Sequence, residues 1–96
     1  MRRYYIVSYD VADQKRLRRI YKKMCGFGDP LQFSVFQCEL SATEKILLLE
    51  TLNEIVNKRE DRVLIIDLGV LRKENDRIEF IGKSLSPQED RCAVIV

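Results

Sequence analysis

Apolar and polar positions alternate along the first strand-forming stretch of the chain, residues 4–11. The run YYIVSYDV is rich in β-branched and aromatic residues, which favour a pleated, half-buried surface. A period of two places Tyr5, Val7 and Tyr9 on one face and ends the other face at Asp10. The pattern therefore predicts a strand that delivers one carboxylate at the point where the next element begins.

Helical spacing follows in two later segments. A first amphipathic helix is predicted before the Gly- and Pro-containing stretch 26–30, because apolar residues fall at i, i+3, i+4 and i+7: Leu17, Ile20, Tyr21 and Met24. The capping-box sequence of residues 41–44, with Ser41 and Glu44 at its ends, predicts the start of a second helix. Its predicted apolar stripe consists of Ile46, Leu49, Leu52, Ile55 and Val56, broadened by Leu47 and Leu48. We expect this helix to pack firmly on a sheet.

Further β-prone runs complete the pattern. Residues 31–40 predict either one long bent strand or two short strands that meet at a bulge. Residues 62–68 are almost wholly apolar, which predicts a central strand covered on both faces. Residues 77–82 alternate like an edge strand, and residues 93–96 could add to a partner subunit or fold back onto their own sheet.

This order of elements predicts an α+β fold of one domain, residues 1–96. An antiparallel sheet with two helices on one face, the ferredoxin-like αβ plait, accommodates the order with short connections. A chain of 96 residues can build only one modest core, so dimerisation would help it. We expect the C-terminal strand region, residues 77–96, to lie at a dimer interface.

The sequence contains no histidine. This excludes histidine-based catalytic triads, the usual imidazole general base and the commonest transition-metal ligand. Catalysis would therefore depend on carboxylates, hydroxyls, arginine, lysine or a hard metal ion, and oxygen-ligated magnesium or manganese is the plausible cofactor.

The three cysteines, Cys25, Cys38 and Cys92, are odd in number and widely spaced. They fit neither a disulfide framework nor the paired spacing of a zinc site, which indicates a reducing cytosol. No apolar run approaches the roughly 20 residues that span a bilayer, and the charged start passes into a strand without a cleavage signal. We therefore expect a cytoplasmic protein that does not associate with membranes.

Positive charge is concentrated in the first helix, although the net charge of the chain is only +2. The cations of this segment, which has no acid between them, are Lys15, Arg16, Arg18, Arg19, Lys22 and Lys23. Such a run can be a solvated helix face. It lacks the acid-to-base pairing that stabilises an exposed helix, so an anionic partner is the alternative.

Asp10 is the candidate chemical centre, with a simpler alternative in which Asp10 or Asp13 caps the first helix. The residues that could act with it, or contact nucleic acid, are Tyr9, Arg16, Arg18, Arg19, Ser34, Phe36 and Gln37. Each has an ordinary structural explanation, because Phe36 could be a core residue, the polar residues could be strand surface and the arginines could be solvated.

Three motifs together resemble a known family. They are Tyr-Asp-Val-x-Asp-x-x-Arg from Tyr9, a basic helix ending in Gly-x-Gly, and Gln-Phe-Ser-Val-Phe-Gln-Cys-Glu-Leu from Gln32. The whole chain is similar to the small CRISPR-associated endoribonuclease family, the second of the two core spacer-acquisition proteins. Pro30 departs from the pattern, because relatives often carry a basic residue there.

The resemblance implies a ferredoxin-like homodimer in which two strand-end aspartates face each other and hold a divalent ion, usually magnesium. Asp10 matches that aspartate, as catalytic and metal-binding residue. The first-helix arginines, Ser34 and Phe36 match positions linked to activity or substrate contact.

Two functions follow from the resemblance, both in spacer acquisition and antiviral defence. The first is a metal-dependent endonuclease that hydrolyses RNA or double-stranded DNA. The second is a non-catalytic DNA-binding scaffold that bridges subunits of the CRISPR integrase. A toxin-like ribonuclease of the same general plait is a third possibility.

Overall fold

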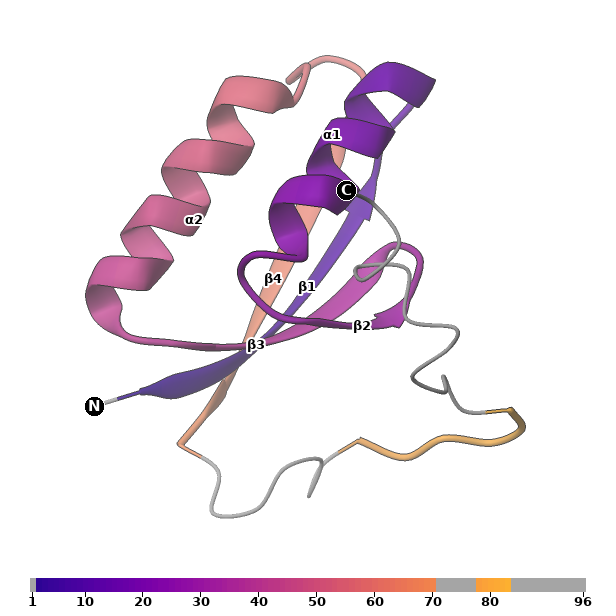
Figure 1. Ribbon diagram of the computed structural model, residues 1–96. Coiled ribbons are helices and arrows are strands. Elements are labelled where there is room, and N and C mark those ends of the chain that lie inside the picture. Colours follow the sequence, from indigo (N-terminus) through magenta and orange to yellow (C-terminus); the bar gives the residue numbers. More distant parts are fainter. Residues whose placement is uncertain (1, 71–77, 84–96) are drawn as a thin grey trace.

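The computed structural model describes residues 2–70 and 78–83, and its centre is a four-stranded antiparallel sheet (Figure 1). The elements in chain order are β1 (Arg3–Asp10), α1 (Gln14–Met24), β2 (Asp29–Gln32), β3 (Val35–Leu40), α2 (Ala42–Ile55) and β4 (Arg62–Gly69). The strand order is β2-β3-β1-β4, and both helices cover the same face. This arrangement is the ferredoxin-like αβ plait, so the predicted fold class is confirmed.

β1 is an inner strand that pairs antiparallel with β3 on one side and β4 on the other. Tyr5, Val7 and Tyr9 are buried against the helices, as the alternation predicts. Ile6 and Ser8 face the other way and are partly exposed, and Asp10 at the strand end is exposed. The helix-free side of the sheet, called the open face below, thus carries the carboxylate.

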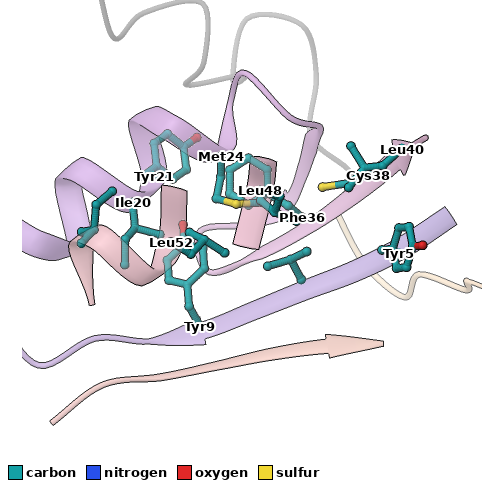
Figure 2. Close-up of a cluster of buried hydrophobic side chains, with 12 residues drawn as sticks. Tyr5, Tyr9, Ile20, Tyr21, Met24, Phe36, Cys38, Leu40, Leu48 and Leu52 are labelled. Atoms are coloured by element: carbon teal, nitrogen blue, oxygen red, sulfur yellow. The ribbon is translucent and has the colours of Figure 1, made fainter. Parts of the chain in front are cut away.

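The core lies between the sheet and the two helices (Figure 2). β3 contributes Phe36, Cys38 and Leu40, and the helices contribute Ile20, Tyr21, Met24, Leu48, Leu52 and Ile55. Cys38 is a free thiol, and burial raises its pKa to about 12. Cys25 is disulfide-bonded, which the interpretation of the cysteine spacing did not predict.

The capping box at the start of α2 is confirmed, with reciprocal bonds between Ser41 and Glu44 of 2.8 and 3.2 Å. The predicted apolar stripe is confirmed at Leu48, Leu52 and Ile55, which are buried, and is wrong at its N-terminal end. Four successive apolar residues, 46–49, cannot all face the sheet when each turns about 100° from the last. Ile46, Leu47 and Leu49 are therefore exposed.

Residues 31–40 form neither a single strand nor two strands joined by a bulge. β2 and β3 are an antiparallel pair connected through Phe33 and Ser34, with a register shift between Pro30 and Gln32. Proline suits this position because β2 is an edge strand, where a missing backbone donor breaks no ladder.

β4 was expected at the centre of the sheet and lies instead at its edge in the part of the chain that the structure describes. Val63 and Ile65 pack against the core, whereas Leu64 and Ile66 are exposed on the open face. The run is apolar on both faces, yet the described part of the chain covers only one of them.

The predicted strand at residues 77–82 is not seen in residues 78–83, which form no strand. A strand needs a neighbouring strand to satisfy its backbone groups, and residues 78–83 pair with none of the four strands in the part of the chain that the structure describes. The remainder of the predicted interface region 77–96, including the β-prone residues 93–96, lies outside the described residues.

Two phenylalanines test the assignment of the core. Phe36 is 0% exposed and Phe33 is 62% exposed, so Phe36→Ala should lower the free energy of unfolding by about 3–5 kcal/mol. Phe33→Ala, the matched control, should lower it by less than about 1.5 kcal/mol, the scale of its ring contact with Tyr21. Urea denaturation measures both, and equal losses would contradict this description.

Candidate metal and nucleic-acid site at the end of β1

The β2–β3 turn lies beside the end of β1. The Tyr9 N–H donates to the Ser34 carbonyl oxygen at 3.0 Å, and the Tyr9 hydroxyl donates to the Phe33 carbonyl oxygen at 2.8 Å. The Tyr9 and Phe36 rings stack with centroids 6.3 Å apart. Burial raises the pKa of Tyr9 well above its usual value, so the hydroxyl stays a proton donor. These contacts fix the strand end next to Asp10.

Asp10 does not cap α1. The N-cap is Asp13, whose carboxylate accepts the Arg16 N–H at 2.9 Å. Within residues 2–70 and 78–83, the Asp10 side chain forms no hydrogen bond or ion pair. Asp13 is therefore the residue that caps the first helix, and the Asp10 carboxylate is exposed and able to bind a ligand.

Asp61, just before β4, ties the segment after Asp10 to the end of α2. Its side chain is 0% exposed and accepts hydrogen bonds from the backbone N–H groups of Ala12 at 3.0 Å and Asn57 at 2.8 Å. The Arg16 guanidinium donates to the same carboxylate through Nε at 2.8 Å and Nη2 at 3.1 Å. The Arg16 guanidinium has the largest effect, and together these donors hold the pKa of the Asp61 carboxyl well below its usual value.

The same contacts determine what Arg16 can do. Its guanidinium also reaches Glu60 at 3.0 Å, and the hydrogen bond to Asp61 raises its own pKa. Arg16 is thus held by two acids, whereas the remaining cations of α1 are exposed: Lys15, Arg18, Arg19, Lys22 and Lys23. α1 still presents a continuous positive surface without Arg16.

Residues 1–78 match the model of the family described as CRISPR associated protein Cas2. The chain belongs to this family. It is 49% identical to the CRISPR-associated endoribonuclease Cas2 of Geobacter sulfurreducens, over 100% of both chains. A crystal structure of a Cas2 protein is 32% identical with a TM-score of 0.74, over 91% of this chain and 94% of that one. The Streptococcus pyogenes Cas2 structure is 28% identical with a TM-score of 0.71, over 82% and 99%.

Family membership confirms the resemblance that the motifs predicted. The structure brings Asp10, Tyr9 and Ser34 together at one end of the sheet. Tyr9 and Phe36 are buried, so their part is to shape the strand end rather than to contact nucleic acid directly. Arg18 and Arg19 are exposed and can reach a partner.

Two residues at this site were missed by the sequence analysis. Asp61 contacts Arg16, which lies 45 positions away in the chain, and Arg62 pairs with Asp10 across the sheet. No local pattern marks either residue. Only the antiparallel pairing of residues 62–68 with residues 4–10 could have indicated Arg62.

The residues around Asp10 in one subunit do not by themselves complete a metal site among the described residues. Among the described residues, no group of three or more histidine, cysteine, aspartate or glutamate side chains could hold a metal ion. Asp10 offers one hard oxygen donor group, which suits magnesium or manganese but leaves an octahedral shell dependent on other ligands. A second Asp10 from another copy would fit this requirement.

The Asp61 contacts predict how stability depends on pH. Because the folded pKa of Asp61 lies below the unfolded value of about 3.9, its stabilising contribution is complete above that value. It is lost as the pH falls through the folded pKa. Asp61→Asn should lower the Tm at pH 7, and the difference from wild type should narrow below about pH 4.

Thermal unfolding between pH 2 and pH 7 measures this difference. Glu60→Gln is the matched control, because Glu60 is exposed and reaches the same arginine through one contact. We expect little change in its Tm. A constant difference for Asp61→Asn at all pH values would contradict the assigned role.

Proposed function

We propose that this chain is a CRISPR adaptation protein that acts as a homodimeric, metal-dependent endonuclease on RNA or double-stranded DNA. The observation that carries the proposal is the exposed Asp10 carboxylate, which is neither a helix cap nor part of an ion pair among the described residues. The names of its relatives support a nuclease, because the Geobacter sulfurreducens protein is called a CRISPR-associated endoribonuclease.

The open face supports the homodimer. Leu64 and Ile66 of β4 are exposed there beside Ile6 of β1, which pairs directly with Ile66. A contiguous apolar surface of this kind is typical of an interaction site in a soluble protein. A second copy bound by the same face would cover the second apolar side of β4, and a twofold axis near the strand end would bring two Asp10 carboxylates together.

The chemistry follows from the two carboxylates. They would hold a magnesium or manganese ion, and a bound ion of this kind supplies a Lewis acid for the scissile phosphate. Without histidine, the Asp10 carboxylate is also the candidate general base for the attacking water. Arg18 and Arg19 would contact neighbouring phosphates and position the strand.

A specific observation also favours a second function, a scaffold that binds DNA and bridges subunits of the CRISPR integrase. α1 exposes five cations, and a single subunit has no complete metal-binding cluster in the part of the chain that the structure describes. Phosphate contacts alone are sufficient for sequence-independent binding. In this alternative, Asp10 is dispensable and the positive surface of α1 is required.

Asp10→Asn distinguishes the two functions. We expect the cleavage rate of RNA and duplex DNA in magnesium to fall by at least ~100-fold, the scale of losing a general base. Asp13→Asn is the matched control, because asparagine retains the helix cap and the charge change is the same. If Asp10→Asn cleaves as fast as wild type, the nuclease proposal is wrong. Spacer acquisition that survives the substitution would favour the scaffold.

Leu64→Glu tests the homodimer. Leu64 is 53% exposed on the open face, and Leu47, on the outer side of α2, is 54% exposed. Each Leu64→Glu dimer would bury two unpaired carboxylates, so its dissociation constant should rise by roughly 100-fold or more. Leu47→Glu should leave the dimer intact. Sedimentation velocity measures both, and a dimer that survives Leu64→Glu would place the interface elsewhere.

A further inference from the structure

We propose that Arg62 is a substrate-binding residue of this site, whose guanidinium binds a phosphate of the nucleic acid held at Asp10. The proposal rests on the function proposed above and adds a residue from β4 to a site otherwise built from β1, α1 and the β2–β3 turn. It follows from where the sheet register places two exposed, oppositely charged side chains.

The register sets Arg62 directly opposite Asp10. In the β1–β4 pair, Ser8 faces Leu64, Tyr9 faces Val63 and Asp10 faces Arg62. Tyr9 is buried and Val63 packs against the core, so the next pair projects from the open face. Directly opposed residues have Cβ atoms about 4.5–5.5 Å apart, which places both side chains at one end of the open face.

Asp61 limits how far this pair can move. It precedes Arg62 in the chain, and its covered carboxylate holds the backbone N–H of Ala12 and the guanidinium of Arg16. The turn that follows Asp10 is therefore attached to the residue that precedes Arg62. The backbone segments that carry Asp10 and Arg62 are therefore held next to each other, as a preformed binding site requires.

The charge of Arg62 is not used within the described part of the chain. Arg2, Arg3 and Arg16 each form an ion pair with an acid there. Arg62 is exposed and forms none, although Asp10 lies opposite it. A carboxylate and a guanidinium that are neighbours yet separate leave room for a group that both can use.

A phosphate is the group that fits. Its oxygens accept the paired donors of a guanidinium, and a divalent ion at Asp10 would bind another oxygen of the same group. Arg62 would then offset the charge that builds on the phosphate during cleavage. The same chemistry applies to RNA and DNA, because both present phosphodiesters.

The test compares Arg62→Ala with Arg59→Ala. Arg59 is an exposed arginine in the connection that precedes β4, so the two variants lose the same charge within three positions of each other. Binding of a 20-base-pair duplex and of a single-stranded RNA is measured in EDTA over a range of salt concentrations. Each lost phosphate contact should reduce the slope of log K against log salt by about 1.

We expect the reduced slope for Arg62→Ala and a wild-type slope for Arg59→Ala. In magnesium, the KM for cleavage should rise roughly tenfold for Arg62→Ala, the scale of a charged hydrogen bond. Arg62→Lys should keep the salt slope, because it keeps the charge, and still show a raised KM, because lysine lacks the fork of donors. Sedimentation velocity on each variant determines whether the dimer is still formed.

The outcomes separate this proposal from the nuclease proposal. If Asp10→Asn cleaves as fast as wild type, the nuclease proposal is wrong. If the salt slope still falls for Arg62→Ala and not for Arg59→Ala, the phosphate contact of Arg62 is supported independently of that proposal. Equal slopes for wild type and Arg62→Ala would overturn the proposal. It is also overturned if Arg62→Ala and Arg59→Ala change the slope equally, or if Arg62→Ala only dissociates the dimer.

Discussion

The register of β1 between its two neighbours is the constraint on which the site depends. Because side chains alternate along a strand, a slip of one residue would exchange the positions of Tyr9 and Asp10. It would bury an unpaired carboxylate among aromatic rings and expose Tyr9, at a cost that folding does not tolerate. Hydrogen bonds on both sides of β1 and the stacking of Tyr9 on Phe36 favour one register. The location of Asp10 is thus a consequence of core packing.

The Asp61 contacts show why positive charge on a helix is a weak guide to binding residues. Arg16 lies among exposed cations of α1, yet its guanidinium neutralises a covered carboxylate that also holds two backbone N–H groups. Removing Arg16 would leave that carboxylate without its main partner, so a loss of activity could reflect a displaced strand end. Arg18 and Arg19 are free of this role, which makes them better probes of contact with nucleic acid.

Local physics made much of this fold predictable, whereas contacts distant in sequence were not. The alternation around Val7 and the capping box at Ser41 depend on neighbouring residues, and both are confirmed. The edge position of β4 and the exact buried stripe of α2 depend on what packs against each element, and the predictions were wrong for β4 and for Ile46, Leu47 and Leu49 of α2. Asp10 was singled out as a candidate from its position at a strand end. Arg62 was not, because its proximity to Asp10 exists only once β1 and β4 pair.

The prediction of a central β4 had a physical basis. Its sequence is that of a strand covered on two faces, and within the described part of the chain only one face is covered. In the proposed dimer a second copy covers the other. The strand that supplies this apolar surface also begins with Arg62, and the neighbouring strand ends with Asp10. In that dimer, association of the two subunits would also assemble the site. A metal ion shared by two Asp10 carboxylates would bind the dimer more tightly than the monomer, so metal binding would in turn stabilise the dimer.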